Sequence, residues 1–153
     1  MNTIEVQTVV ETDNLPTEEQ LQYWVDTALS SFTEDTELVI RIVDETESAE
    51  LNGRYRHKQG ATNILSFPAD LPEFVEVNLL GDLVVCAPVL AREATEQGKA
   101  LHDHWAHIII HGVLHLLGYD HIDEEEAQFM ENKEIALLQQ LTIANPYLQS
   151  EAA

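Results

Sequence analysis

Residues 102–118 read HDHWAHIIIHGVLHLLG, and no other stretch of the chain constrains the architecture as strongly. The stretch is apolar on nearly every side apart from its histidines, which is typical of a helix in the centre of a core. Gly118 can take the left-handed conformation that ends a helix and turns the chain back sharply. We therefore expect a central, buried helix that ends at Gly118.

Apolar runs that precede this helix predict a sheet. Four runs have the length and pattern of strands, namely TIEVQTVV (3–10), ELVIRIVD (37–44), ATNILSFP (61–68) and LLGDLVVCA (79–87). Helical spacing predicts further helices over residues 17–32, 45–56, 87–100 and 123–141. The expected fold class is α+β, with a mixed sheet of about four strands packed with about five helices. Residues 1–153 are expected to form one domain.

The histidines of the central helix continue into the turn that follows it. Residues 111–121 read HGVLHLLGYDH, which has the spacing H-E-x-x-H-x-x-G-x-x-H of the metzincin metalloproteases. His111 and His115 are four residues apart, so both can offer ring nitrogens to one ion from the same helix face. After the turn at Gly118, His121 could supply a third ligand. Three neutral ligands leave a fourth position open, which is typical of a catalytic zinc site.

The alternative interpretation of these side chains is a set of hydrogen-bonded core histidines without a metal. Three unpaired buried imidazoles would be costly to desolvate, so the spacing favours the metal site. His104 and His107 continue the same stripe of the helix. We interpret both as structural, and contact with the metal ligands or the substrate is the alternative. Asp120 is adjacent to His121 and could orient that imidazole.

One position departs from the protease pattern. Gly112 stands where a zinc protease has the glutamate that takes a proton from the attacking water. Peptide hydrolysis needs such a group to carry the proton to the leaving amine. Phosphodiester cleavage instead gathers negative charge on phosphoryl oxygens, which a metal and a guanidinium can stabilise. The missing glutamate favours a phosphodiesterase with Arg56 as the guanidinium, although Arg56 could also be a solvated surface charge.

Charge and composition limit the partners and the compartment. The chain has 28 acidic residues against 7 Lys and Arg, a formal charge of −21, which argues against a broad surface for DNA or RNA. Three of these cations, Arg54, Arg56 and Lys58, nevertheless crowd one short stretch. Cys86 is the only cysteine, so no intrachain disulfide is possible, in agreement with a reducing cytoplasm. Neither a signal peptide nor a membrane segment is expected.

The histidine pattern stands in a longer series of motifs. It is preceded, in order, by ELNGRYRHKQGATNILSFP, LGDLVVCA and EATEQGK. In these motifs the chain resembles the YbeY endoribonucleases, bacterial single-strand-specific enzymes of ribosomal RNA maturation. By this resemblance His111, His115 and His121 match the family's ligands for one zinc ion, and Arg56 matches the arginine of an L-N-x-x-Y-R motif considered essential for activity. The HKQGAT that follows Arg56 departs from relatives, which often have an acid or further cations there.

The resemblance also implies a fold, a role and partners. The fold would be related to the zinc hydrolases, and the role would be completion of the 3′ end of 16S rRNA and ribosome quality control. The implied partners are single-stranded ribosomal RNA, small ribosomal subunit proteins or an assembly GTPase. Two other functions stay open. One is a ribosome-assembly factor with a structural metal, because an acidic surface suits basic ribosomal proteins. The other is a metallopeptidase whose base comes from elsewhere, such as Glu124 or Asp120.

Overall fold

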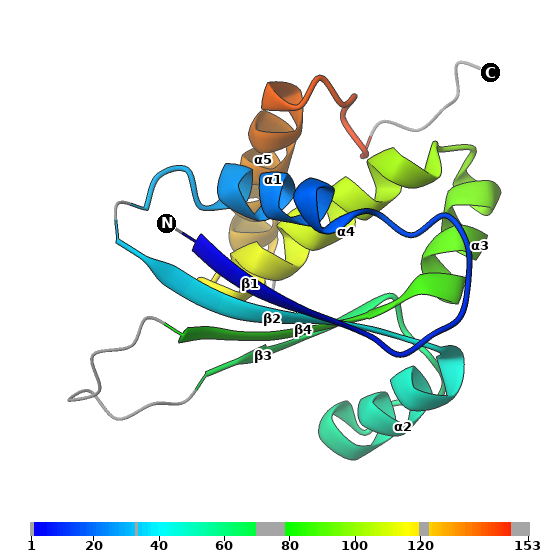
Figure 1. The fold of residues 1–153 in the computed structure, drawn as a ribbon. Coiled ribbons are helices and arrows are strands. Elements are labelled where there is room, and N and C mark those ends of the chain that lie inside the picture. The colour runs from blue at the N-terminus through cyan, green and yellow to red at the C-terminus, as the bar shows by residue number, and fades with distance from the viewer. Residues whose placement is uncertain (1, 33, 70–78, 120–122, 148–153) are drawn as a thin grey trace.

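Four strands and five helices are seen in the computed structural model, which describes residues 2–32, 34–69, 79–119 and 123–147. The strands are β1 (Asn2–Thr8), β2 (Thr36–Val43), β3 (Ile64–Pro68) and β4 (Leu79–Cys86). The helices are α1 (Glu18–Ala28), α2 (Glu45–Arg56), α3 (Ala87–Gln97), α4 (Leu101–Leu116) and α5 (Glu124–Gln140). Figure 1 shows that they surround one sheet, so the predicted α+β class is confirmed.

The strands form one mixed sheet in the order β1-β2-β4-β3. β2 pairs in parallel with both β1 and β4, and β3 pairs antiparallel with β4. The register aligns Ile40 with Leu83 in the centre of the sheet and Ile64 with Val85 near its edge. β3 therefore forms one edge of the described sheet, and its outer side is available to line a site.

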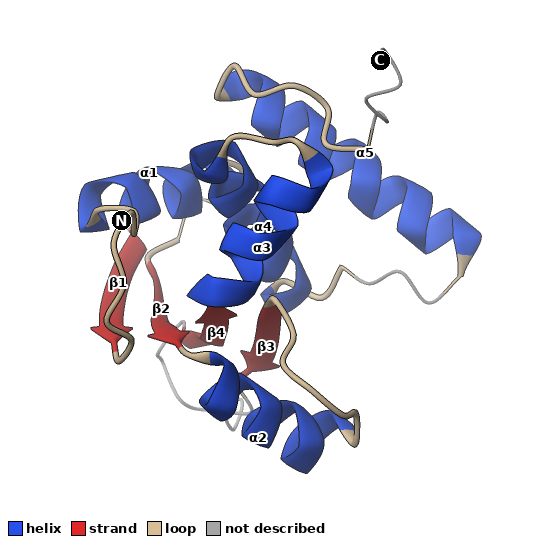
Figure 2. Cartoon of the chain, turned by 90° about the vertical axis from the view of Figure 1, so that its right-hand side faces the viewer, coloured by secondary structure: helices blue, strands red, loops and turns tan. Residues whose placement is uncertain are grey.

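Helices cover the two faces of the sheet unequally. In both views, α1, α3, α4 and α5 lie on one side of the sheet, and α2 lies on the other (Figures 1 and 2). α4 contacts β3 and β4 and is itself flanked by α1, α3 and α5. Its Ile109, Ile110, Val113 and Leu114 have no exposed surface. The predicted central helix is thus confirmed.

Local signals in the sequence explain where the helices begin and end. The Asp44 carboxylate accepts a hydrogen bond from the backbone N–H of Glu47 at 2.9 Å and caps α2. The Asp123 carboxylate caps α5 in the same way by accepting from Glu126 at 2.8 Å. Gly98 ends α3 with a φ of 65°, and Gly118 follows α4 with a φ of 99°. Both glycines adopt the left-handed backbone that favours this residue at helix ends.

Gly112 lies where α4 comes closest to the sheet. A Cβ atom at this position would be 2.6 Å from Ile64 Cδ1 and 2.9 Å from Leu83 Cδ2, both buried. The Gly112 carbonyl also accepts a hydrogen bond from Ser66 Oγ on β3 at 3.3 Å. At the position where a zinc protease has its glutamate, α4 therefore packs directly against the sheet, and this packing leaves no space for an acidic side chain.

Gly112→Ala is expected to lower the free energy of unfolding by roughly 1 kcal/mol, because an overpacked core costs about 1–3 kcal/mol and alanine returns up to about 1 through its helix propensity. Urea unfolding of both chains measures the difference. The matched control is Gly53→Ala in α2, where the new Cβ would meet only the Lys58 carbonyl oxygen at 3.7 Å. That variant should be as stable as the wild type or more so. An equal increase in the free energy of unfolding of both variants would refute the close packing at Gly112.

Candidate metal centre

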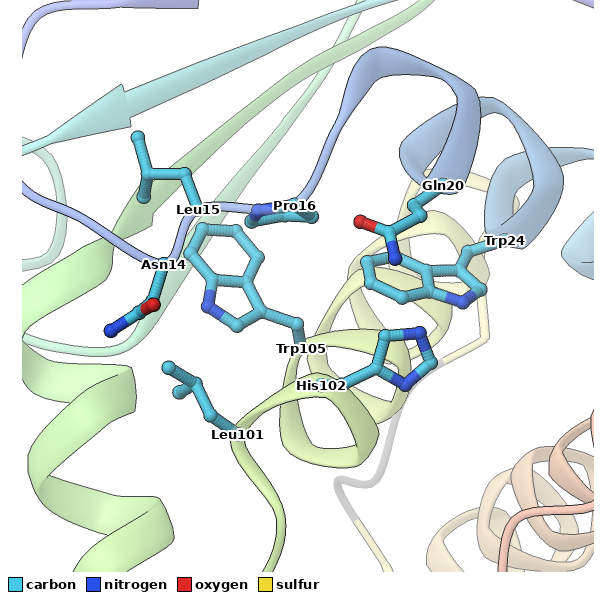
Figure 3. Close-up of a pocket in the computed structure, with 8 residues that line it drawn as sticks. All are labelled: Asn14, Leu15, Pro16, Gln20, Trp24, Leu101, His102 and Trp105. Carbon is cyan, nitrogen blue, oxygen red and sulfur yellow. The ribbon is translucent and has the colours of Figure 1, made fainter.

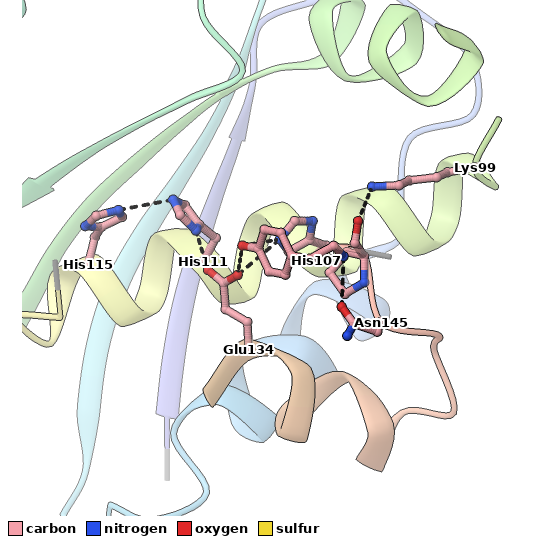
Figure 4. A network of polar contacts seen from close by, with 8 residues as sticks. Lys99, His107, His111, His115, Glu134 and Asn145 are labelled. Carbon is pink, nitrogen blue, oxygen red and sulfur yellow. Dashed lines mark hydrogen bonds and ion pairs between the residues drawn. The ribbon is translucent and has the colours of Figure 1, made fainter. Parts of the chain in front are cut away.

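His111 and His115 face one another one turn apart in the second half of α4. Their Nε2 atoms are 3.1 Å apart, and their ring planes cross at 77° (Figure 4). Two imidazole nitrogens bound to one zinc ion at about 2.0–2.1 Å with tetrahedral angles are about 3.3 Å apart. The observed separation and the borderline-soft imidazole donors therefore fit a shared zinc ion. Both residues are only partly buried.

A pocket of about 560 Å³ has both histidines and Arg56 in its wall. Arg56 is the last residue of α2, and the opposite wall comes from α4 and the turn after it. Asn63 and Ser66 contribute polar atoms from the edge strand β3 and the residue before it. The fold thus brings Arg56 to the same pocket as His111 and His115, although α2 and α4 lie on opposite faces of the sheet.

The remaining predicted site residues divide into two groups. His121 and Asp120 lie outside the described residues. Glu124 is described and lies exposed in the first turn of α5, where an acid complements the positive end of the helix dipole. Among the described residues, those that line the pocket of Arg56 include no carboxylate. This part of the pocket accordingly offers no base of the kind that a metallopeptidase requires.

Glu134 of α5, which the sequence prediction missed, lies against His111 on the side away from His115. Its side chain has no exposed surface, and its Oε1 atom accepts a hydrogen bond from His111 Nδ1. The Oε2 atom lies 3.2 Å from His107 Nε2 and also accepts a hydrogen bond from the Tyr147 hydroxyl. Figure 4 shows the continuous chain of contacts from His115 through His111 to Glu134.

These contacts determine the charge state of the network. Burial alone would raise the pKa of Glu134, but hydrogen bonds from His107, His111 and Tyr147 outweigh it and lower the pKa to about 2. Burial and the neighbouring carboxylate raise the pKa of the Tyr147 hydroxyl well above its usual value. Burial lowers the pKa of His107. At neutral pH Glu134 is thus an ionised carboxylate that accepts hydrogen bonds from the groups around it.

The same residues form a group that could hold a metal ion. One ligand atom from each of His107, His111 and Glu134 lies within 4.8 Å of the other two. His111 is therefore common to two possible sets of metal ligands. One set points into the pocket of Arg56 through the Nε2 atom of His111, and the other points toward α5 through the Nδ1 atom.

One signal for Glu134 was present in the sequence. In α5 the buried side chains Met130, Leu137 and Leu138 recur at helical spacing, and Glu134 occupies the same stripe. An acid on the apolar stripe of an amphipathic helix is buried when the helix packs, and a buried carboxylate needs donors. Because α5 contains many other acids that are solvated, this position was not distinguished from them in the sequence.

The other histidines of α4 have different surroundings. His104 Nε2 lies 2.9 Å from a carboxylate oxygen of Glu93 in α3, as the structural interpretation expects. His107 contacts the carboxylate that also binds His111. His102 is exposed and packs edge-on against Trp24 with ring centroids 5.1 Å apart. It lines a separate pocket of about 390 Å³ beside α1, away from the paired histidines (Figure 3).

Comparison with known proteins identifies the family. The sequence model described as "Endoribonuclease YbeY" matches residues 4–142. The chain belongs to the YbeY family. A Colwellia psychrerythraea endoribonuclease YbeY is 53% identical over 95% of this chain and 97% of its own length. The Pseudomonas fluorescens endoribonuclease YbeY is 56% identical over 90% of this chain and 91% of its own length. The resemblance inferred from the motifs is thereby confirmed.

A solved structure supports the fold independently. The solution structure of a Thermotoga maritima protein superposes with a TM-score of 0.57 and covers 90% of this chain and 91% of its own. At 23% identity this likeness concerns the fold alone. In the described ranges, none of the helices has the length and the apolar character that crossing a bilayer requires.

Proposed function

We propose that the chain is a zinc-dependent endoribonuclease that cleaves single-stranded RNA and acts in 16S rRNA 3′-end maturation and ribosome quality control in the cytoplasm. The observation that carries this proposal is the common pocket of Arg56, His111 and His115. Membership of a family of endoribonucleases supports the choice of RNA as the substrate. Small ribosomal subunit proteins or an assembly GTPase are the proposed protein partners.

The proposed site residues would divide the chemistry between them. His111, His115 and His121 would hold one zinc ion, and a zinc ion so held polarises a phosphoryl oxygen and lowers the pKa of water. The Arg56 guanidinium would donate hydrogen bonds to the phosphoryl oxygens and oppose the negative charge that develops on them. Asn63 and Ser66 add polar groups along the edge strand, where they can contact the sugar or the phosphate of the RNA.

The direct test compares three substrates with the zinc-loaded chain. A single-stranded RNA should be cut, and the same sequence as a duplex and an unstructured peptide should stay intact. Mass spectrometry of the new ends identifies the nucleophile, because a 2′,3′-cyclic phosphate points to the RNA 2′-hydroxyl and a 5′-phosphate to water. Cleavage of the peptide that stops on chelation would instead support a metallopeptidase.

A second candidate, a ribosome-assembly factor with a structural metal, rests on one observation. The charge of −21 suits docking to basic ribosomal proteins better than binding to RNA. If the metal were structural, the chain would support rRNA maturation without cutting RNA in any form. Zinc-loaded protein that is inactive on assembled ribosomal substrate would therefore favour this function.

Free single-stranded RNA is expected to bind weakly, with a slope of roughly −2 in log K against log salt. Arg54, Arg56 and Lys58 could make three phosphate contacts, each worth a slope of about −0.7. Glu50, 3.8 Å from Arg54, reduces the positive charge further. We infer that a protein or ribosomal partner delivers the enzyme to its RNA. A salt titration of binding measures the slope, and nanomolar affinity for naked RNA at physiological salt would contradict this inference.

A further inference from the structure

We infer that Glu134 and Tyr147 are positioning residues that hold the His111 imidazole in the tautomer and orientation needed to bind the metal. The inference rests on the proposed metal site of His111 and His115. It assigns a function to α5 and to the segment after it, which lie outside the pocket of Arg56.

The first step concerns the proton on His111. A carboxylate has no proton to donate, so its contact with His111 Nδ1 requires that nitrogen to carry the hydrogen. In the neutral ring the Nε2 atom then carries no hydrogen and presents its lone pair toward His115, whose Nε2 atom is 3.1 Å away. A hydrogen-bonded carboxylate behind a metal-binding histidine fixes the ring and raises its basicity as a ligand.

The second step concerns what fixes Glu134 itself. Its Oε2 atom contacts His107 Nε2 at 3.2 Å and the Tyr147 hydroxyl, while Oε1 contacts His111. One oxygen is therefore anchored and the other is directed at the metal ligand. Because the side chain has no exposed surface, bulk water does not compete with the carboxylate for these donors.

The third step concerns how Tyr147 reaches the network from the segment that follows α5. Lys99 Nζ, before the start of α4, donates a hydrogen bond to the Pro146 carbonyl at 3.1 Å. The Tyr147 backbone N–H donates to Asn145 Oδ1 at 2.8 Å, and its ring packs edge-on against His107 with centroids 5.4 Å apart. These contacts fold the segment back along α4 and bring the Tyr147 hydroxyl to the Oε2 atom of Glu134.

The alternative role of Glu134 is that of a metal ligand, together with His107 and His111. In the structure both carboxylate oxygens already accept hydrogen bonds, and an ion at this position would displace them. Glu134 also lines a different pocket from Arg56, so an ion bound to it would be separated from the guanidinium. A positioning role keeps the ion beside Arg56.

The test measures zinc affinity by competition with a chromophoric chelator, in chains whose fold is checked by circular dichroism. Glu134→Ala is expected to bind zinc about 10–100-fold more weakly and still at one ion per chain. Glu134→Gln keeps an acceptor oxygen and should therefore lose less zinc affinity than Glu134→Ala. Tyr147→Phe should lose less zinc affinity than either variant of Glu134. The matched control is Glu93→Gln, because Glu93 makes the same kind of contact with His104 but none with the paired histidines. Its zinc affinity should equal that of the wild type.

A second readout reports the His111 ring directly. In metal-free wild type, ¹⁵N chemical shifts of His111 should show the hydrogen on Nδ1, and in Glu134→Gln the population with the hydrogen on Nε2 should rise. A folded Glu134→Ala with wild-type zinc affinity would overturn the inference. Zinc binding that is abolished in Glu134→Gln and His107→Ala but kept in His115→Ala would make Glu134 a ligand. If His115→Ala lost zinc affinity and Glu134→Ala lost none, the inference would be refuted and the proposed metal site would stand.

Discussion

His115→Ala is expected to weaken zinc binding by about 10²–10³-fold and to reduce RNA cleavage at limiting zinc by the same factor. Structural zinc sites with four ligands are worth about 10–16 kcal/mol, so one ligand contributes about 3–4 kcal/mol, and each 1.4 kcal/mol is tenfold. His115 is only partly buried, so its removal leaves the core of α4 intact. Chelator competition measures the affinity, and gel analysis of a labelled RNA measures cleavage.

The matched control for this variant is His102→Ala on the same helix. His102 is exposed and packs against Trp24 in a different pocket, so zinc affinity and cleavage should both be unchanged. If His115→Ala kept its zinc at wild-type affinity, the ion would have to bind elsewhere, and the group of His107, His111 and Glu134 would become the site.

Arg56→Ala is expected to reduce cleavage by about 10²–10³-fold at saturating zinc, because a positioned donor to developing transition-state charge is worth about that much. Zinc affinity should not change, since no metal ligand is removed. Arg56 is exposed at the end of α2, so the fold should tolerate the change. Single-turnover cleavage with excess enzyme separates this loss of rate from weaker RNA binding.

Two further variants test the role of the guanidinium. Arg56→Lys keeps the charge but not the paired donors, and partial recovery of the rate is expected. Arg92→Ala removes an exposed arginine of α3 that pairs with Glu45 at 3.0 Å outside the pocket, and its rate should equal that of the wild type. Full activity of Arg56→Ala in rRNA maturation would support the assembly factor in place of the nuclease.

The parts of the fold that local chemistry determines could be predicted from the sequence. The central helix α4 followed from an almost uninterrupted apolar surface, and its end followed from Gly118. The strand order β1-β2-β4-β3 did not follow, because pairing between strands depends on contacts distant in sequence. The same limit applies to Arg56, which lines the pocket of the histidines only because the fold brings the end of α2 and one side of α4 to the same pocket.

The predicted ligand pair and the missed carboxylate show the same contrast within the site. Spacing of four residues on a helix brings His111 and His115 together wherever the helix lies. Glu134 reaches His111 only because α5 packs on α4. Tyr147 reaches Glu134 only because the segment after α5 folds back. Gly112 is a further case, since its departure from the protease pattern is explained by packing against Ile64 and Leu83.

The central claim is that a metal bound at the paired histidines enables RNA cleavage beside Arg56. The most direct measurement is cleavage of a single-stranded RNA by the wild-type chain as purified, after chelation, and after return of one equivalent of zinc. We predict activity with one zinc per chain, its loss in the metal-free chain and its full recovery with zinc. Undiminished cleavage by metal-free protein, or none by the zinc-loaded chain on assembled ribosomal substrate, would contradict the claim.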